Sequence, residues 1–248
     1  MSTALGNDMK FMGETTHPGG QFRDIRVVGR TRMEGDVTCR SLACMGEARL
    51  SGGLQSGETR ILGHATVAGA VDGGDCTVLG QMECAASLRV RKLNCTGQLK
   101  VKGQVDAEKV RLYGQMVVQG DCNVDDFESN GAFEISGLLS VDRLLVHPNG
   151  PCKVAEVGGA RIEVRRRVGF LGRNGMADWI HQMLPGSRSS RLEAQMVEGD
   201  EVFLEDSVVG TVRGALVQIG RGCRIGTVEY QDSYSCEPGS EVGEVRQL

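Results

Sequence analysis

Apolar and polar residues alternate in short runs along most of the chain, and the runs recur every seventeen residues. When one repeat is numbered from Ile25, its apolar residues fall mainly at positions 1, 3, 7, 9, 13 and 15. Alternation with a period of two is typical of a half-buried β-strand. Each repeat therefore predicts three short strands, which in the first repeat cover residues 25–27, 31–33 and 37–39.

Glycine marks two of the boundaries between these strands. Steps of seventeen residues from Gly29 meet a glycine every time as far as Gly131, and steps from Gly35 do so with the exception of Ala86. Glycine is favoured where the backbone needs a positive φ or where a side chain has no room. We therefore predict that both columns are corners of a coil. The corner glycines are Gly29, Gly46, Gly63, Gly80, Gly97, Gly114, Gly131, Gly35, Gly52, Gly69, Gly103, Gly120 and Gly137.

A polar residue at position 17 of each repeat supplies a third corner, so each repeat predicts a three-sided coil. Stacked coils of this kind form parallel sheets around one apolar interior. The predicted fold class is all-β, a three-sided parallel β-helix (β-solenoid) with coils of about 17 residues. Helical repeats are excluded because seventeen residues cannot hold a pair of helices and their turns, and leucine-rich repeats are longer, at roughly 20–29 residues.

The repeat does not cover the whole chain. The predicted parts are a flexible N-terminal tail (1–22), the β-helix (23–164), a basic linker with a short helix near 174–184 (165–199), and a C-terminal β segment of two to three shorter coils (200–248). Asn174 is a suitable N-cap for the short helix, and apolar residues follow it at helical spacing. The repeat leaves open whether the C-terminal coils extend the β-helix or pack beside it.

Composition fits a narrow solenoid interior. The 248 residues include 36 glycines but only 4% aromatic residues. The nine cysteines form no C-x-x-C pair, and most of them fall at inward positions, where cysteine acts as a small apolar residue. We find no signal peptide and no apolar run of the ~18 residues that a membrane span needs. The expected location is therefore the cytoplasm, with reduced thiols.

Charge is spread unevenly. The formal net charge of −4 argues against nucleic acid as a partner. Residues 161–192, however, hold seven arginines against Glu163 and Asp178. Their basic and apolar side chains could contact an anionic membrane or an acidic partner; otherwise the segment is a solvated linker whose helix covers the solenoid. The candidate membrane or partner patch is Arg165, Arg166, Arg167, Phe170 and Trp179.

Catalytic chemistry is weakly represented. The dipeptides Ile219–Gly220 and Ile225–Gly226 fit the hexapeptide repeat of left-handed β-helix enzymes, namely acyltransferases and γ-type carbonic anhydrases. Those enzymes need a histidine base or histidine metal ligands. The four histidines (His17, His64, His147 and His181) have no clustered partners in the sequence. We therefore predict no enzyme, no catalytic residue, no cofactor, no metal and no small-molecule substrate, and keep the hexapeptide enzyme as the alternative.

The glycine columns and their Val, Leu, Ile and Cys interior resemble the bactofilins, a family of bacterial polymer-forming cytoskeletal proteins. The resemblance covers roughly residues 22–164, and the stretch from Val217 to Tyr230 is similar to the C-terminal part of a Gram-positive branch of that family. It implies a right-handed β-helix that forms filaments end to end without nucleotide. It also implies a scaffold for cell-shape, envelope or motility machinery, often at the inner face of the membrane.

Elementary physics also favours assembly of the chain with itself. The terminal coils of a solenoid expose a strand edge and part of the core, so they must be capped or must stack on another copy. No strong capping helix precedes Ile25. We therefore predict a homopolymer that assembles head to tail. The candidate residues for end-to-end assembly are those of the first predicted coil, Ile25, Val27, Met33 and Val37.

Overall fold

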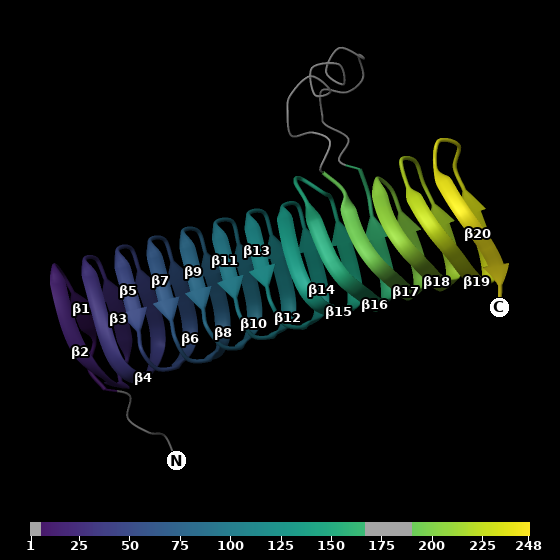
Figure 1. Ribbon diagram of the computed structural model, residues 1–248. Coiled ribbons are helices and arrows are strands. Elements are labelled where there is room, and N and C mark those ends of the chain that lie inside the picture. The colour runs from purple at the N-terminus through teal and green to yellow at the C-terminus, as the bar shows by residue number, and fades with distance from the viewer. Residues whose placement is uncertain (1–5, 167–189) are drawn as a thin grey trace, which may run out of the picture. The chain divides into compact units, whose positions relative to one another are not determined.

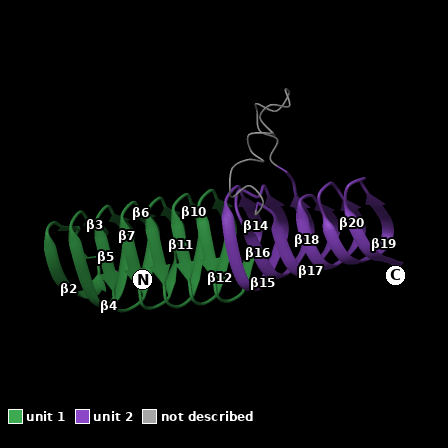
Figure 2. Cartoon of the chain, turned by 45° about the horizontal axis from the view of Figure 1, so that its top comes forward, with its two compact units in different colours: residues 1–124 green, residues 125–248 purple. Residues whose placement is uncertain are grey.

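The computed structural model describes residues 6–166 and 190–248 of the chain. The chain forms two compact units, residues 1–124 and residues 125–248 (Figure 2). All regular elements in the described residues are β-strands, and the pairs between them are parallel. The predicted all-β solenoid of stacked coils is therefore confirmed. The short helix predicted near 174–184 lies outside the described residues.

Unit 1 is a stack of parallel strands, and from β3 onward the paired residues lie seventeen positions apart along the chain (Figure 1). Val37, Leu54, Val71, Leu88 and Val105 follow one another in register through successive coils. The strands are β1 (Met9–Phe11), β2 (Glu14–Gln21), β3 (Asp24–Val27), β4 (Arg30–Cys44), β5 (Glu47–Leu50), β6 (Leu54–Ile61), β7 (His64–Val67), β8 (Val71–Val78), β9 (Gln81–Cys84), β10 (Leu88–Cys95), β11 (Gln98–Val101), β12 (Val105–Leu112) and β13 (Gln115–Val118). The next strand, β14 (Cys122–Ser129), crosses the boundary to unit 2.

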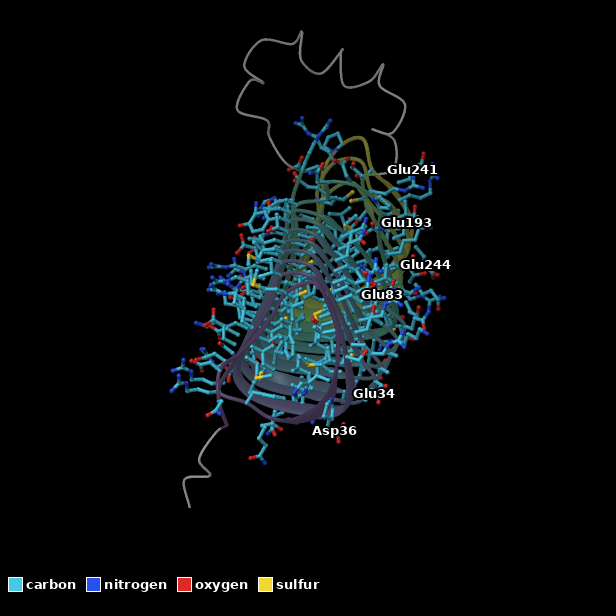
Figure 3. All side chains as sticks on the ribbon, turned by 90° about the vertical axis from the view of Figure 1, so that its left-hand side faces the viewer. Glu34, Asp36, Glu83, Glu193, Glu241 and Glu244 are labelled. Atoms are coloured by element: carbon cyan, nitrogen blue, oxygen red, sulfur yellow. The ribbon has the colours of Figure 1, made fainter. Side chains whose placement is uncertain are left out.

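The apolar columns fill the interior of each coil. Buried and exposed residues alternate along the strands, as in β9 and β11, where the second and fourth residues are buried. In the view from the N-terminal side, the ribbon of the first coil has a three-sided outline, and the labelled side chains of Glu34 and Asp36 lie at its margin (Figure 3). Parallel in-register stacking places like residues above one another, so the columns of the sequence become continuous files of core side chains.

The first glycine column has no room for a side chain. A Cβ built on Gly63 or Gly80 would lie 2.0 Å from the carbonyl oxygen of the column glycine one coil earlier. The same oxygens accept hydrogen bonds from the next coil, as in Gln81 N–H to Gly63 O at 2.9 Å. The φ angles of Gly63 and Gly80 are not in the left-handed region. Of the two reasons that favour glycine, close backbone approach therefore applies here.

The second glycine column is less uniform. Gly35 has a φ of 98°, and nothing lies within 4 Å of an added Cβ there, so the left-handed backbone favours glycine. Gly69 and Gly103 instead lie close to the backbone of the preceding coil. Ala86 occupies the same column, which shows that this corner accommodates a methyl group in at least one coil.

Unit 2 is also a parallel stack, but its coils vary in length. Phe133 pairs with Cys152, Cys152 with Leu192, Leu192 with Ser207, and Arg224 with Glu241. Residues 167–189, which the structure does not describe, fall within the longest of these steps. The strands are β15 (Ala132–Val146), β16 (Cys152–Val164), β17 (Leu192–Leu204), β18 (Ser207–Ile219), β19 (Arg224–Cys236) and β20 (Glu241–Gln247). Because β16 pairs with β17, the C-terminal coils extend the stack of unit 2 instead of packing beside it.

Two predicted boundaries need correction. Strands β1 and β2 lie in the range predicted to be a flexible tail, residues 1–22, and Met9 pairs with Ile25. Up to Pro18, the residues of this coil pair with residues sixteen positions later, so a strict period of seventeen does not reveal the coil. Strand β17 likewise begins at Leu192, inside the predicted linker 165–199, because Leu192 and Val197 fill buried positions of the stack.

No described segment forms a helix with the length and apolar character that a bilayer crossing requires.

Candidate functional site

The N-terminal end of unit 1 is an open strand edge. Strand β1 pairs with β3 and strand β2 pairs with β4, and no other described strand covers the outer side of either (Figure 1). Three rings fill the end coil, with the His17 ring centroid 5.6 Å from those of Phe11 and Phe22. Phe11 and Phe22 are buried, whereas Met9 and His17 are only half-buried. The rings therefore cover the core here only in part.

The predicted assembly residues do not lie at this end. Ile25, Val27, Met33 and Val37 are each at most 1% exposed. They are buried because β1 and β2 form one further coil above them, with Met9 over Ile25 and His17 over Met33. The prediction of these four residues as the contact surface is corrected to the coil of residues 9–22.

The C-terminal end of unit 2 leaves its core open. Val242 and Val245 of β20 are in register with Ile225 and Val228, which are 2% and 0% exposed. Among the described strands, none covers this column beyond β20, and Val245 is 42% exposed. In the described residues, the part of β19 around Tyr234 and Cys236 pairs with β18 alone. This end therefore presents unpaired backbone and apolar side chains together.

Eight of the nine cysteines are buried, and Cys236 alone is exposed. Burial raises the pKa of Cys76, Cys95, Cys122 and Cys152 to about 12. A raised pKa keeps these thiols neutral at physiological pH, and neutral thiols are poor nucleophiles. The interpretation of the inward cysteines as small apolar core residues agrees with this geometry.

The thiols give a test of this arrangement. In dispersed native protein at about pH 8, a thiol-reactive chromophore should label one cysteine per chain quickly, because Cys236 is the one cysteine that the reagent can reach. The other eight should react only after denaturation. Cys236→Ser should abolish the rapid phase. Rapid labelling of two or more thiols in the native protein would contradict the buried assignment.

Of the predicted basic patch, the structure describes Arg165 and Arg166, and both guanidinium groups have an acidic partner, Glu163 for Arg165 and Asp206 for Arg166. The Arg165 Nε atom lies 2.7 Å from Glu163 Oε2, and its guanidinium stacks on the Phe203 ring at 4.5 Å. The hydrogen bond from Arg165, with a second one from Arg161, lowers the pKa of Glu163. The backbone N–H of Arg166 donates to Glu205. Arg167, Phe170 and Trp179 lie outside the described residues.

The histidines that an enzyme would need have separate environments. His17 packs between two phenylalanine rings, His64 contacts Gln81 and Thr66, and His147 contacts the carbonyl oxygen of Arg165. In the described part of the chain, no group of three or more histidine, cysteine or acidic side chains could hold a metal ion. His181 lies outside that part.

Comparison with known proteins gives two partial matches and no function. The chain is 38% identical over 95 residues to the uncharacterized protein YhbF of Bacillus subtilis, a match that covers 38% of this chain and 34% of YhbF. It is 34% identical over 110 residues to the uncharacterized protein YhbE of the same organism, covering 44% of this chain and 42% of YhbE. The chain thus spans less than half the length of either relative. No family model and no solved structure matches.

Proposed function

We propose that the chain is a non-enzymatic, cytoplasmic scaffold that assembles with itself head to tail, as the bactofilin-like repeat suggests. Its partner is a second copy of the same chain, and assembly needs no nucleotide or other cofactor. The filament would organise cell-shape, envelope or motility machinery. The observation that carries the proposal is that the first and last described coils both leave strand edges unpaired.

Two features of these ends favour pairing with another copy. Unpaired N–H and C=O groups on a strand edge are a template for a further strand. The uncovered valines of β20 repeat a column that is buried one coil earlier. A second copy that docks its β1–β2 coil on β19 and β20 would continue both the hydrogen-bond ladder and the apolar column. Burial of apolar area at the junction then stabilises the filament.

Blocking one end at a time tests the proposal. Val242→Asp/Val245→Asp places two charges where stacking would bury them, and Met9→Asp does the same at the other end. Each variant alone should stay monomeric in sedimentation velocity, while the wild type forms filaments visible by negative-stain microscopy. An equal mixture of the two variants should stop at dimers, because only one pair of compatible ends remains. Burying unpaired charge costs several kcal/mol, enough to reduce association by orders of magnitude.

The control replaces outward-facing valines on the lateral surface. Val117→Asp/Val208→Asp adds the same charge to half-exposed positions of β13 and β18 and should leave the filaments intact. A wild-type protein that remains monomeric at tens of micromolar across salt and pH would refute self-assembly. If the Met9→Asp variant dimerises alone, the ends pair tail to tail and the head-to-tail arrangement is wrong.

A further inference from the structure

A single row of exposed apolar side chains runs along the first glycine corner of unit 1. It contains every large apolar residue that is exposed in the described part of this unit, and each is between 41% and 62% exposed. The residues lie one per coil, directly before the corner glycine, and Thr96 is the one polar member of the row. We name the row the apolar ridge: Met12, Val28, Met45, Leu62, Leu79, Thr96 and Tyr113.

Hydrogen bonds show that the members of the ridge are stacked. The backbone N–H of Leu62 donates to Cys44 O, and that of Leu79 donates to Ile61 O, both at 2.8 Å. The N–H groups of Val28, Met45, Thr96 and Tyr113 make the same bond to the coil before them. At a spacing of ~4.8 Å per coil, the seven positions form a straight row about 30 Å long.

The fold itself does not require apolar residues at this position. The same hydrogen bond to the preceding coil identifies the corresponding residues of unit 2, which are His147, Arg165, Glu205, Gly220 and Glu237. None of these has a large apolar side chain. Isolated exposed apolar residues are ordinary on protein surfaces, whereas a contiguous set marks an interaction site. The ridge therefore indicates a contact surface specific to unit 1.

The charges beside the ridge indicate what it contacts. The row two residues before the ridge contains Lys10, Arg26, Arg60 and Arg111 and no acidic residue. The row two residues after the ridge contains Arg30, Glu14 and Glu47. The two rows that border the ridge directly therefore hold five basic and two acidic residues, although residues 1–124 contain fifteen basic and thirteen acidic residues.

We propose that the apolar ridge and its basic borders form a peripheral binding site for an anionic lipid bilayer. A straight row fits a flat surface, where the apolar side chains enter the headgroup region and the long basic side chains reach lipid phosphates. A second copy packed ridge to ridge would bring basic rows together. A strip one side chain wide also falls short of the ~800 Å² per partner of a stable protein interface.

Vesicle flotation tests the site, because filaments alone do not float. Wild-type protein should float with equimolar phosphatidylglycerol–phosphatidylcholine vesicles and much less with phosphatidylcholine alone. Leu62→Gln/Leu79→Gln should weaken binding about tenfold or more, since two inserted apolar side chains are lost. The matched control is Leu138→Gln/Leu216→Gln, which removes two leucines of similar exposure from unit 2 and should bind as wild type.

A variant that binds vesicles more tightly gives a second test, because misfolding cannot produce tighter binding at this site. Thr96→Leu completes the ridge and should tighten vesicle binding about threefold or more. Equal flotation of wild type and Leu62→Gln/Leu79→Gln would overturn the proposal, as would equal flotation with neutral and anionic vesicles. If the wild type does not float but the double leucine variant alters filament width, a second copy covers the ridge instead. Filaments that persist in the double variant separate this result from end-to-end assembly.

Discussion

Gly80→Ala is expected to destabilise unit 1 by at least the upper end of the ~1–3 kcal/mol that overpacking usually costs. The new Cβ would lie 2.0 Å from the carbonyl oxygen of Gly63 and 2.4 Å from that of Leu62. Both atoms belong to backbone, and hydrogen bonds to Gly63 O and from Gly80 N–H hold the two coils together. The methyl group can therefore be accommodated only if the coils separate. Urea unfolding followed by far-ultraviolet circular dichroism measures the loss.

The matched control is Gly53→Ala, which lies in a different column of the same unit. The nearest atom to its added Cβ is Ala70 O at 3.1 Å, a tight contact but not a collision. The next coils carry Ala70, Ser87 and Gln104 at this position, so the fold accommodates side chains there. We expect a change below about 1 kcal/mol, since alanine also restricts the unfolded chain. Equal losses for Gly80→Ala and Gly53→Ala would contradict the close-approach explanation.

The sequence predicts the repeating part of the fold because one coil constrains the next. A parallel in-register stack places residue i over residue i+17, so apolar columns and the crowded glycine corner appear directly in the sequence. The sequence alone does not show whether a given corner glycine is needed for a positive φ or for close approach of the backbone. The structure separates them, since Gly80 is limited by contact with Gly63 and Gly35 by its positive φ.

The sequence fails where a coil changes length. Residues 9–18 of the end coil pair with residues sixteen positions later, so a period of seventeen does not reveal this coil and instead places Ile25 at the end of the stack. The ridge is an outward column, so the inward apolar columns that predict the fold do not include it. Its signal is present in the sequence as Val28, Met45, Leu62 and Leu79, apolar residues with the same period at an outward position.

Two aromatic side chains pack against each other in one layer of the interior of unit 2. Phe127 and Phe133 are 0% and 2% exposed, and their ring centroids lie 5.6 Å apart with an interplanar angle of 67°. Edge-to-face contact of this kind adds about 0.5–1.5 kcal/mol to the burial of the two rings. The columns of both residues carry smaller, non-aromatic side chains in every coil of unit 1. A smaller side chain in place of either ring would leave a void in this layer.

Phe127→Ala should therefore cost about 3–5 kcal/mol of stability, the range observed for large-to-small changes in rigid cores. The closed coil cannot collapse onto the vacated volume, because the hydrogen-bond ladders on each side fix its perimeter. Unfolding should be measured in the Val242→Asp/Val245→Asp background, since assembly would otherwise raise the apparent stability. Phe203→Ala is the control, because that ring is only half-buried and lies under Arg165. It should lose roughly 1–2 kcal/mol. Equal losses for the two variants would mean that the Phe127 layer relaxes, and the rigid-perimeter argument would then be wrong.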